Sequence, residues 1–149
     1  MRTPSLTLTA AAFVSLTLAA CGTQLKTLPI QPALSAAPAA MTTTGNADIA
    51  IYFSTQPHAE VARRVGEASH SVRIARSTDG PDVSCNKALA DAVGKLRADA
   101  RSKGANAVIN VSTRFHENES KSATEYTCGV SPSAAAIAVK GDLVVLQAQ

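Results

Sequence analysis

The chain contains six residues of the kinds that most often act as metal ligands or nucleophiles. They are Cys21, Cys85, Cys128, His58, His70 and His116. The histidines form neither an HxxxH nor an HExxH spacing and no two cysteines have CxxC spacing, so the usual zinc signatures are missing. The sequence also has no GxSxG nucleophile elbow and no GxxxxGK[ST] phosphate loop. We therefore expect no enzyme, no metal site and no cofactor, and histidines that lie at the surface or on edge strands.

Cys21 directly follows an apolar stretch that is too short to span a bilayer and is typical of an export signal over residues 1–20. An ordinary secretory signal would fit this pattern, but the sequence LAAC that ends at Cys21 closely resembles the lipobox of bacterial lipoproteins. This resemblance implies that Cys21 becomes the first residue, carries a diacylglyceryl thioether and is N-acylated. Two or three acyl chains hold a protein firmly on a membrane. Because Gly22 rather than Asp follows, the resemblance favours the outer membrane, with the domain facing the periplasm or the cell surface.

Residues 21–47 differ in composition from the rest of the chain, because Thr, Ala, Pro and Ser dominate and Lys26 is their single charge. They lack a periodic apolar pattern, and their prolines favour extended conformations. We interpret them as a tether between the lipidated Cys21 and the folded domain. Leu25, Leu28 and Ile30 could instead dock on the domain or on a partner.

The remaining residues, 48–149, predict a single domain that is rich in strands. Alternating apolar residues or extended character predict strands at 49–53, 65–74, 107–115, 125–132 and 134–146. His70 falls on the apolar side of its strand. In the strand 107–115, the alternation places Ile109 with Val111 on one face and Val108 with Asn110 on the other.

One amphipathic helix is predicted between the second and third of these strands. Asn86 is a suitable N-cap, Leu89, Val93 and Leu96 recur at helical spacing, and Gly104 provides a stop. A single helix can bury its apolar stripe against one face of a sheet. We therefore expect an α+β, two-layer sandwich in which one main helix packs on a four- to five-stranded mixed sheet.

Two cysteines remain once Cys21 is assigned to the lipid. In an exported protein, an intramolecular Cys85–Cys128 disulfide is the simplest interpretation, and it would pin the start of the helix to the penultimate extended segment. A redox-active pair and two free thiols remain as alternatives, although neither has CxxC spacing to support it.

The composition makes a nucleic-acid partner improbable on physical grounds. The 14 basic and 11 acidic residues are scattered along the chain, so no basic patch is available to follow a phosphate backbone. Aromatic residues make up only 3% of the chain, which leaves few platforms for stacking bases. We expect no nucleic acid and no identifiable small molecule among the partners.

Two stretches, SCNKALADAVGKLRADARSKGANAVINV and YTCGVSPSAAAIAVKG, resemble the YbjQ-like domain, in particular as it occurs in outer-membrane stress-sensor lipoproteins of the Rcs phosphorelay. The lipid anchor and the proline-containing tether agree with this resemblance. It implies a domain braced by disulfides that signals through contacts with envelope proteins. Cys85 and Cys128 match one such bond, and this chain has no second cysteine pair.

These inferences together predict a membrane-anchored periplasmic lipoprotein that acts as a protein-interaction or envelope-stress signalling module. Its expected partners are the membrane, through Cys21, and an envelope protein. The alternative is a passive envelope component, or a domain that binds a small ligand or a metal without a signalling role.

Overall fold

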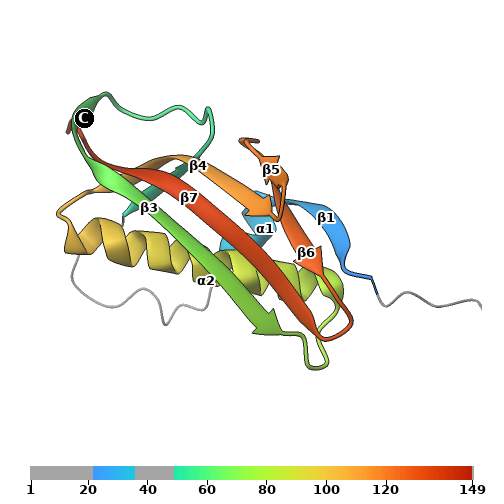
Figure 1. The fold of residues 1–149 in the computed structure, drawn as a ribbon. Coiled ribbons are helices and arrows are strands. Elements are labelled where there is room, and N and C mark those ends of the chain that lie inside the picture. Colours follow the sequence, from blue (N-terminus) through green and yellow to red (C-terminus); the bar gives the residue numbers. More distant parts are fainter. Residues whose placement is uncertain (1–21, 36–48, 149) are drawn as a thin grey trace, which may run out of the picture.

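A computed structural model describes residues 22–35 and 49–148, which form one mixed sheet and two helices (Figure 1). The elements in chain order are β1 (Gln24–Pro29), α1 (Ile30–Ser35), β2 (Ala50–Phe53), β3 (Val61–Ala75), α2 (Pro81–Ser102), β4 (Ala107–Phe115), β5 (Asn118–Ser120), β6 (Glu125–Val130) and β7 (Ala134–Leu146). The predicted α+β class, with one main helix on a mixed sheet, is confirmed. The sheet has seven strands rather than four or five, because β1 and β5 were not expected.

The strand β7 organises the sheet, because three other strands pair with it. Along one edge it pairs antiparallel with β3, from Ala134 opposite Ala75 to Leu146 opposite Val61. On its other edge it pairs with β6 near Ala135 and then with β4. The sheet continues from β6 to β1 and from β4 to β5 and to the parallel strand β2.

The helix α2 lies along one face of this sheet, across β3 and β7 (Figure 1). Its inward side chains are fully buried and pack on a core that the sheet supplies from β2, β3, β4, β6 and β7. Small residues in α2 let the helix approach the sheet closely. The inward residues of α2 are Cys85, Ala88, Leu89, Ala92, Val93, Leu96 and Ala100.

The predicted start of this helix is wrong, since α2 begins at Pro81 and not after Asn86. Gly80 occupies the N-cap position with extended backbone, and proline is favourable in the first turn because its fixed φ suits a helix and its missing N–H has no partner to lose. Asn86 therefore lies inside α2. The predicted stop is confirmed, because Gly104 has a φ of +71° just beyond the helix.

A bulge in β4 overturns the predicted alternation of its side chains. Asn110 has a φ of +53°, and the pairing with β7 shifts between Ile109 and Ser112, opposite Gly141. Val108 and Val111 therefore both face α2, whereas Ile109 packs on the other face. A side chain at Gly141 would meet Val108 at 2.5 Å, so this position needs glycine.

The first half of the expected tether is part of the folded domain. β1 pairs with β6, the Ile30 backbone N–H donates to the Thr124 carbonyl oxygen at 2.9 Å, and Ile30 and Ala33 are buried in the core. A tether over residues 21–47 is thus corrected, because residues 24–35 form structure. An edge strand held by backbone hydrogen bonds needs no apolar alternation, which explains why the pattern missed it.

Apart from residues 1–21, 36–48 and 149, the chain contains no helix that is long and apolar enough to cross a membrane.

If residues 24–35 belong to the core, Ile30→Ala should lower the free energy of unfolding by about 2–5 kcal/mol, since Ile30 is 1% exposed. Urea unfolding of the purified protein measures this loss. Leu25→Ala is the matched control, because Leu25 is 47% exposed and its loss should cost about 0.5 kcal/mol or less. If Ile30→Ala lowered the free energy of unfolding by no more than about 0.5 kcal/mol, as expected for Leu25→Ala, Ile30 of α1 would not contribute to the stability of the domain.

Candidate functional site

The predicted Cys85–Cys128 disulfide is confirmed. It joins α2 to β6, and both cysteines are completely buried. The bond closes a loop with a sequence separation of 43, which corresponds to about 4 kcal/mol in the chain-entropy treatment of the unfolded state. A buried bond that links two elements of the core is suited to bracing the domain.

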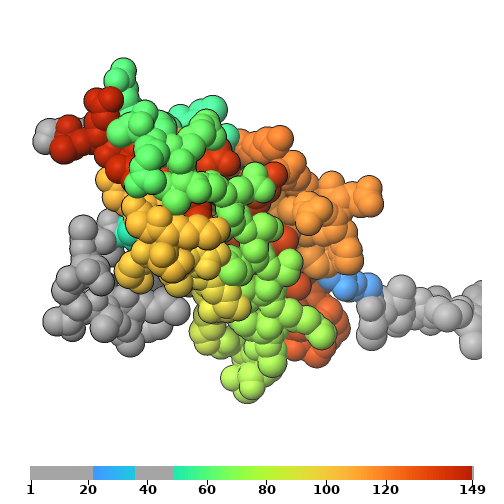
Figure 2. Space-filling model, turned by 60° about the vertical axis from the view of Figure 1, so that its left-hand side comes forward, coloured from blue at the N-terminus to red at the C-terminus, as the bar shows by residue number. Residues whose placement is uncertain are grey.

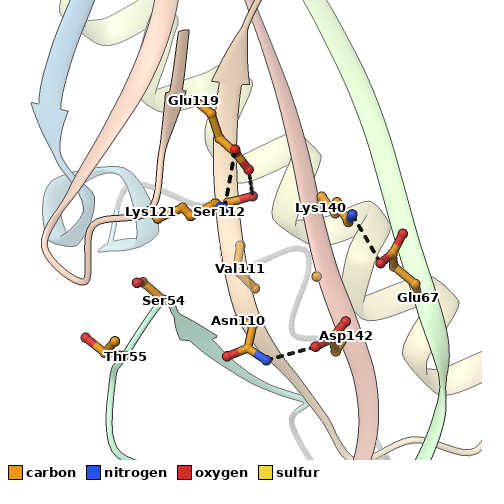
Figure 3. A pocket seen from close by; sticks show the side chains of 11 residues that line it. Ser54, Thr55, Glu67, Asn110, Val111, Ser112, Glu119, Lys121, Lys140 and Asp142 are labelled. Carbon is orange, nitrogen blue, oxygen red and sulfur yellow. Dashed lines mark hydrogen bonds and ion pairs between the residues drawn. The ribbon is translucent and has the colours of Figure 1, made fainter. Parts of the chain in front are cut away.

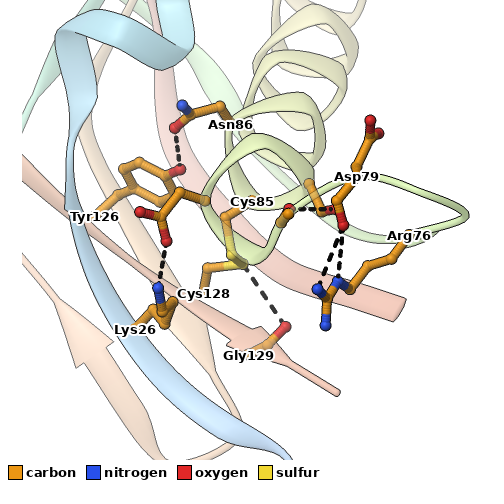
Figure 4. A network of polar contacts seen from close by, with 11 residues as sticks. Lys26, Arg76, Asp79, Cys85, Asn86, Tyr126, Cys128 and Gly129 are labelled. Carbon is orange, nitrogen blue, oxygen red and sulfur yellow. Dashed lines mark hydrogen bonds and ion pairs between the residues drawn. A yellow bond between two sulfur atoms is a disulfide. The ribbon is translucent and has the colours of Figure 1, made fainter. Parts of the chain in front are cut away.

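Polar contacts surround this bond and connect it to the N-terminal strand (Figure 4). Tyr126 in β6 donates from its hydroxyl to Asn86 Oδ1 at 2.6 Å. Asn86, which was predicted to cap the helix, therefore lies inside α2 and accepts a hydrogen bond from β6. Lys26 in β1 lies opposite Cys128 in the register and forms an ion pair with Asp82 at the start of α2. The disulfide and the ion pair therefore hold β6 and β1 to the same end of α2.

Burial raises the pKa of the Tyr126 hydroxyl far above its usual range, and the nearby Asp82 carboxylate acts in the same direction. The phenol therefore remains protonated in the folded protein and continues to donate to Asn86 at alkaline pH.

The sheet face opposite α2 carries a groove of small residues. Its floor is formed by Ser69 and Ser71 of β3, Ser112 of β4, and Ala136 and Ala138 of β7, and we call it the outer-face groove. The register places Ser71 opposite Ala138, which lies opposite Arg114 on its other side. No helix covers these residues among the described elements. An apolar cluster of Ala107, Ile109, Val144 and Leu146 fills a different part of this face.

One end of the groove is closed by paired charges and amides (Figure 3). Lys140 lies 3.2 Å from Glu67, and Ser112 donates to Glu119 at 2.9 Å. Asn110 donates to Asp142 at 2.8 Å. These acids therefore have partners within the domain.

The other end of the groove is more basic. Arg73 and Arg114 form no ion pair within residues 22–35 and 49–148, and His116 and Glu117 lie beside them. The Phe115 ring covers Gly129, where a Cβ atom would meet the ring at 2.2 Å. These two guanidinium groups, which have no ion-pair partner in the described part of the chain, lie next to a small-residue floor and an aromatic ring, and such a surface is suited to carboxylates on an extended chain.

The histidines are not brought together. His58 contacts the Ala59 carbonyl oxygen at 2.7 Å, and His116 packs edge-on against Phe115. His70 lies on the side of β3 that faces α2, as predicted, with Nε2 2.8 Å from Asp99 Oδ2. Within the described ranges, no three His, Cys, Asp or Glu side chains are placed to hold a metal ion.

Cys21 lies outside the described residues, and its predicted lipidation stays a prediction. The sequence reasoning missed the outer-face groove. The signal that could have found it is the alternation of small residues in two strands, with Ser69 and Ser71 in one and Ala136 and Ala138 in the other.

No protein-family model matches the chain, and a search of curated proteins gives no match.

Removal of the disulfide should lower the free energy of unfolding by about 4 kcal/mol in the double variant Cys85→Ala/Cys128→Ala. Chemical unfolding of the oxidised wild type and of the variant tests this value. The wild type in a strong thiol reductant should approach the variant. A variant as stable as the wild type would show that the bond does not brace the fold.

Tyr126→Phe should remove an alkaline loss of stability. An unfolded tyrosine ionises near pH 10, and the folded Tyr126 keeps its proton at higher pH, so the wild-type free energy of unfolding falls as pH rises above about 10. At neutral pH the variant should lose about 1 kcal/mol with the Asn86 hydrogen bond. Unfolding curves of the variant and the wild type at pH 8 and 10.5 measure both effects. If the free energy of unfolding fell equally between pH 8 and 10.5 in Tyr126→Phe and in the wild type, the alkaline loss of stability would not come from Tyr126.

Proposed function

We propose that this chain is a lipid-anchored envelope lipoprotein whose oxidised domain is a protein-interaction module, and that the outer-face groove binds the partner. The observation that carries this proposal is the groove itself. Small side chains floor it on the sheet face that α2 leaves open, and one end is flanked by Arg73 and Arg114, which form no ion pair with any described residue. A surface that only had to remain soluble would not need this combination.

The anchor in this proposal is Cys21, on the strength of its resemblance to a lipobox. Only Gly22 and Thr23 separate Cys21 from β1, and these steps span about 10 Å at most. The domain would therefore be held directly at the surface of the outer membrane, without the long tether expected from composition. Close attachment restricts which envelope proteins the groove can reach.

The partner in this proposal is an extended segment of an envelope protein that carries carboxylates. A guanidinium group binds a carboxylate in a bidentate manner, and Arg73 and Arg114 flank the floor on either side of β7. Ala136 and Ala138 leave room above the floor for the side chains of such a segment. A role in envelope-stress signalling, as the resemblance to YbjQ-like lipoproteins suggests, would follow if binding of this segment changes with the state of the envelope.

Site-specific photocrosslinking of the full-length protein in its own cells tests the proposal. A photoreactive residue at Ser71 should capture one discrete envelope protein, whereas the same residue at Lys95, on the solvent side of α2, should not. Ala138→Leu fills the groove and should reduce capture from Ser71 about tenfold. Ser133→Leu, in the exposed β6–β7 turn, is the matched control and should leave capture unchanged.

The same experiment in a Cys21→Ala chain separates anchoring from binding. Loss of capture in this chain supports a module that acts at the membrane. Equal, diffuse capture from Ser71 and Lys95, with or without the anchor, would contradict a partner-binding groove. It would favour the alternative of a passive component or a small-ligand domain.

A further inference from the structure

The strand β3 is long and has a free edge. It pairs with β7 on one side, and within the described residues no strand pairs with its other side. In Figure 2 its green atoms form a continuous ridge along the surface, beside the yellow atoms of the C-terminal part of α2. The backbone N–H and C=O groups on such an edge are a template for another strand.

The part of β3 that is free of irregularities is long enough to pair with a strand. Register shifts occur between Val61 and Arg63 and between Arg64 and Gly66, but the pairing from Gly66 to Ala75 is uninterrupted. The outward side chains of this part are all exposed. They are Glu67, Ser69, Ser71, Arg73 and Ala75.

These side chains complement a second copy of the same strand. In an antiparallel pair with its two-fold axis at His70, Glu67 lies opposite Arg73 of the second copy, and Ser69 lies opposite Ser71. The pairing occurs twice because of the symmetry, so both charges of each strand are matched. On the side that faces α2, Ala68 lies opposite Val72 of the second copy.

Other registers lose this match. The outward side chains of the two copies lie on the same face of the joined sheet only when the two-fold axis passes through a residue and not between two residues. An axis at Ser69 or at Ser71 leaves both Glu67 and Arg73 opposite uncharged residues. An axis at Glu67 or at Arg73 places like charges opposite each other.

We propose that two copies of this chain associate through antiparallel pairing of their β3 strands about His70, which joins the two sheets into one. Glu67 then lies between Lys140 of its own chain, at 3.2 Å, and Arg73 of the second copy. The axis is normal to the sheet, so both outer-face grooves lie on the same side of the joined sheet. The two β1 strands are equivalent, and both anchors can enter one membrane that is perpendicular to the axis.

Cysteine crosslinking of the full-length protein in its own cells tests the register. Two differently tagged chains, Ser69→Cys and Ser71→Cys, should form a disulfide-linked dimer that carries both tags when they are expressed together. Either chain expressed alone should give at least tenfold less disulfide-linked dimer. In a dimer of identical chains the two introduced cysteines are diagonal rather than directly opposite, about 7–8 Å apart, and a disulfide needs closer Cα atoms. Ser69→Cys with Asn118→Cys, an exposed site on β5, is the matched control and should give no such dimer. Peptide mapping confirms that Cys85–Cys128 is intact.

Charge reversal tests the pairing in the same crosslinking background. Glu67→Arg alone or Arg73→Glu alone should reduce the crosslinked fraction about tenfold, because each places like charges opposite each other twice. The double variant Glu67→Arg/Arg73→Glu should restore it, and so should a mixture of the two single variants. The proposal would be overturned if either single-cysteine chain alone crosslinked as well as the two chains expressed together, or if the charge reversals left the crosslinked fraction unchanged. The absence of any dimer in protein with an intact Cys85–Cys128 bond would also overturn it.

Discussion

One long helix has to bury one face of a seven-stranded sheet, and most of the structure depends on this constraint. α2 meets the sheet through alanines as well as larger residues, so Ala88, Ala92 and Ala100 are as fully buried as Leu89 and Leu96. The covered face is therefore mostly apolar, and the half-buried His70, which contacts Asp99 of α2, is an exception. Among the described elements no helix covers the opposite face, and outside the apolar cluster of Ala107, Ile109, Val144 and Leu146 that face is built from serines, alanines and charged residues. The outer-face groove is a consequence of this asymmetry.

The N-terminal elements β1 and α1 cover the part of the core and of the sheet edge that α2 does not reach. Ile30 and Ala33 fill the core beside α2, while β1 covers the edge of β6, which carries Cys128. The covalent bond from Cys128 to α2 and the ion pair from Lys26 to Asp82 fix the same three elements at one end of the molecule. The disulfide and the ion pair therefore both lie near the strand from which the chain leads back to Cys21.

The sequence predicted those features whose cause is local or covalent. The stripe of α2, the strands β2 and β7 and the pairing of two cysteines follow from periodicity and from chemistry, and the structure has them. β1 was missed because backbone pairing with β6 holds it. The bulge at Asn110 was missed because it depends on pairing with β7, where Gly141 lies opposite it, and the pattern of β4 alone does not contain that pairing. The groove needs the register of three strands at once, and no single stretch of the sequence contains that register.

Arg73 connects the two surfaces that this fold leaves open. It lines the basic end of the outer-face groove, and it lies on the free edge of β3, where Glu67 of a second copy would meet it. A carboxylate from a bound segment and the carboxylate from a second copy would compete for the same guanidinium group. In these two proposals, binding in the groove and pairing of the β3 edges would both use the Arg73 guanidinium group, and thermodynamic linkage would make their antagonism reciprocal. Self-association of the domain would then depend on whether the partner is present.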